Sequence, residues 1–215
     1  MNFSIRKECA GPVAFFLLLE LIFWLGSRKF PWLIVLAGLS GLVAVFSLYF
    51  FRDPERKYPE ISSQGIENFI LAPADGKVLD VSSENGQPVV RIFLSLFDVH
   101  LQRCPLEGRV LTTYWRPGKF LTANNPRAHQ LNEQNEIVFE SKYGQYSVTQ
   151  IAGIIARRIR CWVEPDQSVQ KGERIGLIQF GSQVDLKLFG GVEVLVKKGD
   201  KVRAGESIIG IIPKR

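Results

Sequence analysis

The segments Val169-Gln170-Lys171-Gly172-Glu173 and Val202-Arg203-Ala204-Gly205-Glu206 share one pattern, and each is followed by an isoleucine-rich stretch. Glycine adopts φ > 0 without steric cost, so both segments predict tight turns that lead into strands. Two further glycine-centred turns of this kind are predicted at Ala74-Asp75-Gly76-Lys77-Val78 and Leu106-Glu107-Gly108-Arg109-Val110. We therefore attribute these glycines to turn geometry rather than to catalysis.

From Tyr58 onward, short apolar runs with a period of two alternate with glycines, and helical periodicity is scarce. Gly118 to Arg127 has the composition of a loop. The predicted strands are 77–81, 89–96, 108–114, 137–139, 146–152, 174–180, 192–196 and 207–212. Strands with repeated valine–glycine–glutamate turns resemble biotinyl- and lipoyl-type folds. We expect a mainly β, barrel-sandwich domain over residues 58–215, and the repeat argues for this fold rather than for a function.

The N-terminal part differs in composition. Phe30 to Phe51 carries no charge and is long enough to span a hydrocarbon core of roughly 30 Å. Pro12 to Leu25 is also apolar but is interrupted by Glu20. We expect a helical membrane hairpin within residues 1–57, with its basic flanks on the cytoplasmic side. The flanking residues that would anchor it at the membrane surface are Arg6, Lys7, Arg52, Arg56 and Lys57. A signal peptide and an interfacial hairpin are the alternatives.

Composition limits the classes of function. The chain has 215 residues and a net charge of +6, which suits one compact domain with an appendage. Cys9, Cys104 and Cys161 read as free thiols, and His100 and His129 are too few to predict a structural zinc site. The basic residues are scattered rather than gathered into a stripe, so nucleic-acid binding is not predicted.

Four motifs point to chemistry in combination. Phe180-Gly181-Ser182 lies between strand-like segments, and a lone Gly-Ser pair of this kind is usually a turn. The chain also contains Ala72-Pro73-Ala74-Asp75-Gly76-Lys77-Val78, Phe97-Asp98-Val99-His100 and, after the apolar segment, Phe50-Phe51-Arg52-Asp53-Pro54. Together they resemble the short, bacterial-type branch of the phosphatidylserine decarboxylase family, from Phe50 to the C-terminus.

This resemblance implies a membrane-bound decarboxylase that makes phosphatidylethanolamine and CO2 from phosphatidylserine. The Gly181–Ser182 bond would cut itself, leaving a β chain of residues 1–181 and an α chain of residues 182–215 as an interlocked heterodimer. The serine would become a pyruvoyl group, whose ketone forms a Schiff base with the substrate amine and accepts the electrons left by CO2. A higher oligomer is compatible with the sequence.

The resemblance also assigns roles to individual residues. His100 corresponds to a family histidine that transfers a proton, and Asp75 to an aspartate that takes part in self-processing, in the family by orienting a base. The longer branch of the family has a second histidine at the position of Arg103. The role of base in self-cleavage, which the family assigns to that histidine, therefore cannot be assigned to a residue of this chain by the resemblance. Arg103 is instead predicted to pair with the substrate's carboxylate or phosphate. His129 is a further substrate-binding candidate, with a solvated loop as the alternative.

Two other functions remain open. Decarboxylation of archaetidylserine or another serine phospholipid would use the same headgroup chemistry. A membrane-tethered, non-catalytic carrier or binding module is the alternative from another class. A biotinyl or lipoyl carrier presents a lysine at a hairpin tip, and Lys187 is the nearest candidate.

Overall fold

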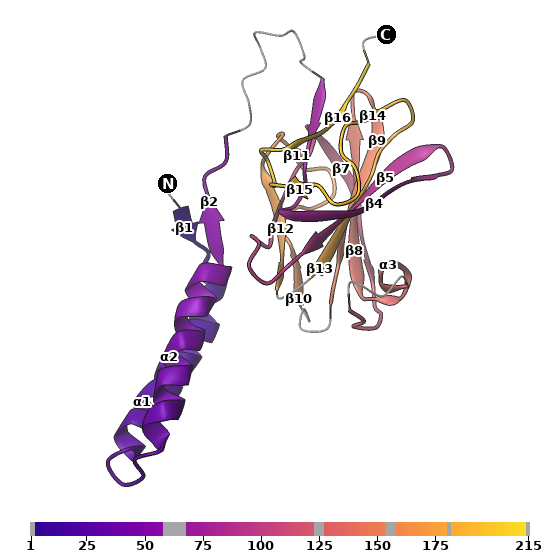
Figure 1. The fold of residues 1–215 in the computed structure, drawn as a ribbon. Helices are drawn as coiled ribbons and strands as arrows, with labels where there is room; N and C mark the ends of the chain where they lie inside the picture. The colour runs from indigo at the N-terminus through magenta and orange to yellow at the C-terminus, as the bar shows by residue number, and fades with distance from the viewer. Residues whose placement is uncertain (1–2, 58–67, 123–126, 154–157, 180–181, 214–215) are drawn as a thin grey trace. The chain divides into compact units, whose positions relative to one another are not determined.

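The chain consists of two compact units, Met1–Glu55 and Arg56–Arg215. The structure is a computed structural model that describes residues 3–57, 68–122, 127–153, 158–179 and 182–213. The first unit is mostly helical and the second is mainly β (Figure 1). The predicted fold class, mainly β with two apolar N-terminal helices, is confirmed at this level.

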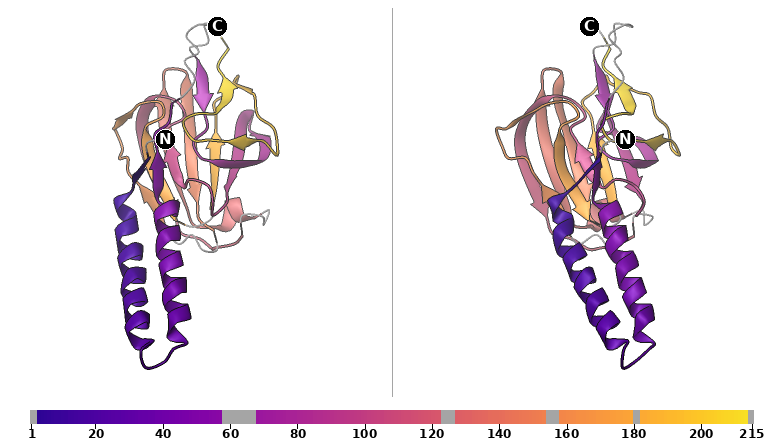
Figure 2. Two further views of the ribbon diagram at one scale, coloured as in Figure 1. Left: turned by 60° about the vertical axis from the view of Figure 1, so that its left-hand side comes forward. Right: turned by 90° about the vertical axis from the view of Figure 1, so that its left-hand side faces the viewer.

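The first unit is a pair of helices closed by a short two-stranded sheet. Its elements are β1 (Phe3–Ile5), the 3₁₀-helix η1 (Lys7–Cys9), α1 (Ala10–Gly26), α2 (Leu33–Phe50) and β2 (Arg52–Pro54). α1 and α2 run side by side in both views of Figure 2. Segments Lys7–Gly26 and Leu33–Phe50 are long and apolar enough to cross a membrane, with mean hydropathies of 2.0 and 2.3.

Small residues bring the two helices together. Ala37, Ser40, Ala44 and Ser47 are the buried positions of α2 apart from Phe50, and they recur at helical spacing. Glu20, the charge that interrupts the first apolar segment, lies against Gly41, where an added Cβ would be 3.0 Å from its Oε1. The glycine therefore leaves room for this carboxyl group between the helices.

The second unit is built from short strands and one short helix. They are β3 (Phe69–Leu71), β4 (Gly76–Glu84), β5 (Gln87–Leu94), β6 (Leu101–Arg103), β7 (Gly108–Arg116), α3 (Ala128–Leu131), β8 (Gln134–Ser141), β9 (Gly144–Ile151), β10 (Arg158–Cys161), β11 (Ser168–Val169), β12 (Arg174–Gln179), β13 (Ser182–Lys187), β14 (Glu193–Val194), β15 (Lys201–Val202) and β16 (Ile208–Ile211). The predicted strands are present, although 192–196 is reduced to the two residues of β14. Six strands of this unit were not predicted: β3, β6 and β10, with three or four residues each, the two-residue strands β11 and β15, and β13, the six-residue strand that begins at Ser182.

The strands form one large and two small sheets. The large sheet has the order β11-β7-β8-β9-β13-β5-β4-β15, and the small sheets have the orders β10-β12-β6 and β14-β16-β3. Alternate residues of the large sheet face a common core and are fully buried, among them Ile92, Val148, Val184 and Leu186. Phe139 and Tyr146 stack in this core with their ring centroids 4.9 Å apart. We call the opposite face of this sheet, which carries the other alternate residues, the outer face.

The repeated glycine segments are tight turns, as predicted. Gly172 and Gly205 have φ values of +80° and +72°, a region that favours glycine. Each turn is closed by a 3.1 Å backbone hydrogen bond, from Glu173 N–H to Gln170 O and from Glu206 N–H to Arg203 O. The two repeats therefore have the same local structure, a two-residue strand followed by a turn and a longer strand.

Candidate active site

Ser182 is the first residue of β13, a strand in the interior of the large sheet. β13 pairs with β5 on one side, where Ser182 is opposite Leu94, and with β9 on the other, where Gln183 is opposite Ile151. Gly181, the other half of the predicted cleavage site, lies outside the described residues. The backbone that begins at Ser182 is thus held by hydrogen-bonded neighbours on both sides.

The loop with Asp98 and His100 starts beside Ser182, because it follows Leu94 directly. The Asp98 carboxylate accepts hydrogen bonds from the backbone N–H (2.8 Å) and the hydroxyl (2.7 Å) of Ser95, which fixes the turn. His100 is fully buried, and its carbonyl accepts a 3.1 Å bond from the N–H of Ile178 in β12. The loop is therefore attached to both strands, β12 and β13, that flank Gly181.

His100 is held in one tautomer. Its Nδ1 lies 3.0 Å from the carbonyl oxygen of Asp98. A carbonyl can only accept a hydrogen bond, so Nδ1 carries the proton of the neutral ring and Nε2 is the basic nitrogen. This arrangement suits a residue that accepts a proton at Nε2.

Asp75 lies in the turn before β4, and its carboxylate is held on both oxygens. Arg56 donates to Oδ2 at 2.7 Å and the N–H of Ala204 donates to Oδ1 at 2.8 Å. Burial raises the pKa of Asp75, while the Arg56 guanidinium lowers it. The next residue, Gly76, has φ +149°, and a Cβ there would be 2.0 Å from the carbonyl oxygen of Phe93. This contact places Asp75 beside the end of β5, close to the partner of Ser182.

Arg103 is buried under the repeated turns. Its Nη1 donates a 3.0 Å hydrogen bond to the carbonyl of Gly172 in the first turn, and its backbone N–H donates to Pro73 O at 2.9 Å. A Cβ on Gly205, in the second turn, would be 2.8 Å from Cδ of Arg103. The two turns thus hold Arg103 and Asp75, and the predicted role of Arg103 in substrate binding stays a prediction.

A chain of buried amides links the large sheet to the histidine loop. Asn135 Nδ2 donates to Gln150 Oε1 (3.0 Å), Gln150 Nε2 to Gln102 Oε1 (2.9 Å), and Gln102 Nε2 to the His100 carbonyl (2.8 Å). All four residues are buried. Because an unpaired buried amide is costly, the chain favours one position of the His100 backbone.

His129 lies on the outer face of the large sheet. It is a half-buried residue of α3 and lines a pocket of about 430 Å³ on the outer face of the large sheet, together with Arg91, Gln134 and Asp185. His100, in contrast, is bonded to β12 of a small sheet. The structure therefore brings the segments of Ser182, His100 and Asp75 to one end of the β unit. His129 is near this end as well, because its carbonyl bonds Gln134, but it lines the pocket on the outer face.

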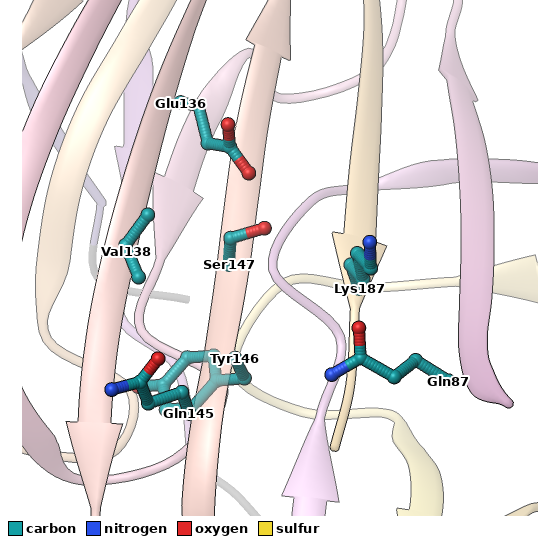
Figure 3. Close-up of a pocket in the computed structure, with 7 residues that line it drawn as sticks. All are labelled: Gln87, Glu136, Val138, Gln145, Tyr146, Ser147 and Lys187. Atoms are coloured by element: carbon teal, nitrogen blue, oxygen red, sulfur yellow. The ribbon is translucent and has the colours of Figure 1, made fainter. Parts of the chain in front are cut away.

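Lys187 is a strand residue. It ends β13 opposite Val89 and Ser147. Figure 3 shows its side chain beside Gln87 in a pocket of about 140 Å³ on the outer face. A carrier lysine needs a hairpin tip from which its prosthetic group can swing. The position of Lys187 does not provide one.

Three residues of this region were not predicted from the sequence. Arg56 was assigned to membrane anchoring because it follows the apolar segment, whereas its side chain bonds Asp75 and Glu206. Gln150 carried no signal of its own, because an amide in a strand pattern is equally common at a solvated position. A weak signal for Gln102 was its place between His100 and Arg103.

Comparisons with known proteins identify the family of this chain. A profile of the family described as phosphatidylserine decarboxylase matches residues 43–210. The phosphatidylserine decarboxylase proenzyme of Desulfotalea psychrophila is 42% identical over 186 residues, 83% of this chain and 85% of the relative. The proenzymes of Carboxydothermus hydrogenoformans (43% over 198 residues, 88% and 85%) and Geobacter metallireducens (37% over 219 residues, 99% and 98%) are similar as well. On this evidence the chain belongs to the phosphatidylserine decarboxylase family.

Proposed function

We propose that this protein decarboxylates phosphatidylserine to phosphatidylethanolamine and CO2, using a pyruvoyl group made by self-cleavage at Gly181–Ser182. The observation that carries the proposal is the meeting of three chain segments, those of Asp75, His100 and Ser182, at one end of the β unit. The names of the relatives support the substrate, and the word proenzyme in those names supports the cleavage.

The topology suits a chain that is cut before β13 and stays assembled. The piece from residue 182 onward contains β13 to β16, and three of these four strands pair with strands of the other piece. β13 lies between β5 and β9, β15 pairs with β4, and β16 pairs with β3. The two pieces would therefore remain one heterodimer, and the new N-terminus at residue 182 would stay at the start of a fixed strand.

The residues present fit a ketone at that position. Such a group supplies the electron sink that decarboxylation requires and that no unmodified side chain offers. His100 is the residue we assign to proton transfer, through Nε2. Asp75 is held by Arg56 and the Ala204 N–H, which fits a carboxylate that orients a base during self-cleavage. Arg103 is positioned by Gly172, and we keep it as a candidate for the substrate's carboxylate or phosphate.

We propose that residues 1–57 anchor the enzyme in the cell membrane with the catalytic domain, residues 58–215, on the cytoplasmic side. The two apolar helices are compatible with membrane association, and the lipid substrate supports it. We also keep the biotinyl/lipoyl-like barrel-sandwich as the proposed architecture, because the two repeats have equivalent turns. The carrier function that such a fold could suggest is disfavoured by the position of Lys187 in mid-sheet.

The intact mass of the purified protein tests the proposal. We expect two chains, residues 1–181 and 182–215, with a blocked N-terminus on the small chain that reacts with carbonyl reagents. Ser182→Ala should remain one chain and release no CO2 from phosphatidylserine. Ser168→Ala, the same change at an exposed serine of β11, is the matched control and should be cut normally. A fully active, uncut wild-type protein would overturn the pyruvoyl mechanism.

A further inference from the structure

The strand register defines which residues share an end of the β unit with Ser182. Arg116 of β7 lies opposite Gln134 of β8, Gln134 opposite Ile151 of β9, and Ile151 opposite Gln183 of β13. On the far side of β13, Ser182 pairs with Leu94 at the end of β5. The end of β7 and the loop after β5 therefore flank the start of β13, and Figure 1 shows α3 at this same end.

Large aromatic side chains are exposed on both flanks. Phe97, in the turn that follows β5, is 68% exposed, and Tyr114 and Trp115, near the end of β7, are 62% and 48% exposed. The bonds from Ser95 to Asp98 fix the turn that carries Phe97. From β7 to β5 there are four strand spacings, so the two aromatic groups are about 19 Å apart along the sheet.

Basic residues accompany these aromatics. Arg116, Lys119 and Arg158 are exposed, and none of them takes part in an ion pair among the described residues. Arg158 belongs to this end because it lies opposite Gln179, the last residue of β12.

The opposite end of the same strands has another charge pattern. There Arg109 pairs with Glu140 and Asp166, and Lys171 with Glu107. The positive charge at that end is thus partly compensated by ion pairs, whereas Arg116, Lys119 and Arg158 have none among the described residues.

We infer that Phe97, Tyr114, Trp115, Arg116, Lys119 and Arg158 form a rim that docks the catalytic end of the β unit onto an anionic lipid bilayer. Aromatic rings with a polar edge prefer the membrane interface, and exposed cations attract anionic headgroups. The same chain carries two helices that are apolar enough to cross a membrane, which supports a bilayer as the occupant. The inference rests on the proposed function, since a docked rim would bring residue 182 to a lipid substrate.

The native tryptophans allow a direct test in the full chain. A variant with Trp24, Trp32 and Trp162 changed to Phe keeps Trp115 as its reporter, and a matched variant keeps Trp162 instead. Trp162 follows Cys161, at the end of β10 away from Arg158, so it lies outside the rim. Both proteins are reconstituted in phosphatidylglycerol–phosphatidylcholine vesicles with and without bromine on the acyl chains.

We expect bromine to quench Trp115 emission at least twofold and to leave Trp162 emission unchanged. Phe97→Ser should reduce the quenching of Trp115. Each cation near an anionic surface contributes about a fivefold factor to binding, so changing Arg116, Lys119 and Arg158 to Gln should weaken docking about 100-fold. Leu195→Ser, at an exposed apolar residue outside the rim, is the control and should keep the quenching of Trp115.

Equal Trp115 emission in brominated and plain anionic vesicles would overturn the inference. So would a Trp115 emission that changes with protein concentration and not with bromination, because a second copy of the chain would then cover the rim. CO2 release from phosphatidylserine is measured on the same vesicles. Its absence in samples with quenched Trp115 would count against the proposed function and leave the docking rim standing.

Discussion

Replacing Arg56 with glutamine should destabilise the β unit strongly, because it leaves a buried carboxylate without its cation. Arg56 lies 2.7 Å from Asp75, and the two side chains are 8% and 12% exposed. Removing one partner of a buried ion pair costs about 3–5 kcal/mol, whereas an exposed pair contributes about 0–1 kcal/mol. We therefore expect Arg56→Gln to lower the free energy of unfolding by about 3–5 kcal/mol near pH 8.

The loss should depend on pH in a defined direction. Burial raises the pKa of Asp75 and Arg56 counteracts it, so the variant should have a still higher pKa. A carboxyl whose folded pKa lies above its unfolded value stabilises the fold at low pH, and this contribution is lost as the pH rises through the folded pKa. The difference between parent and variant should accordingly shrink as the pH falls and Asp75 becomes protonated.

Thermal unfolding in detergent micelles, followed by circular dichroism, measures this effect. Ser182→Ala is the background, so that every protein is compared as one chain. At about 2–4 °C per kcal/mol, Arg56→Gln should lower the midpoint by about 6–20 °C at pH 8, and by less at pH 5. Adding Asp75→Asn to Arg56→Gln should restore part of the loss.

The matched control is Arg109→Gln. Arg109 also faces two carboxylates, but its side chain is 51% exposed. Its midpoint should fall by no more than about 4 °C. A drop below about 2 °C for Arg56→Gln at pH 8 would refute the reasoning, because it would show that water screens the Arg56–Asp75 pair.

Three further predictions concern other sites. His100→Ala should lower the rate of decarboxylation at least ~100-fold. If self-cleavage stays normal in this variant, another group serves self-cleavage. If both activities survive, His100 has only a structural role. Removing residues 1–51 keeps Arg56, so self-cleavage and activity on a short-chain soluble substrate should be preserved, whereas activity on vesicles should fall sharply. Equal activity of the truncated and full-length proteins on vesicles at all salt concentrations would show that the anchor is dispensable. Burial raises the pKa of Asp185 from 3.8 to about 6. The free energy of unfolding should therefore fall as the pH rises through this window and Asp185 ionises. Asp185→Asn should remove up to about 3 kcal/mol of that fall, which a pH series of unfolding measurements tests.

Much of the candidate site was visible in the sequence because its motifs are local. The Asp98-Val99-His100 and Ala74-Asp75-Gly76 segments were recognised from neighbouring residues, and both lie in loops next to strand ends. The role of Arg56 was misinterpreted as membrane anchoring, because a basic residue directly after an apolar segment fits that role. Its partners Asp75 and Glu206 are distant in the chain, so no local pattern could connect them.

The sequence by itself determined the apolar hairpin, most of the longer strands and the glycine turns at Gly172 and Gly205. Each of these depends on periodicity or on the conformational freedom of one residue, which are properties of a short segment. The tertiary structure alone decided that β13 lies between β5 and β9, that the two turns hold Arg103 and Asp75, and that three amides connect the large sheet to His100. These features are pairings between distant segments, and their free energy comes from burial and hydrogen bonds that form only when the sheets have assembled.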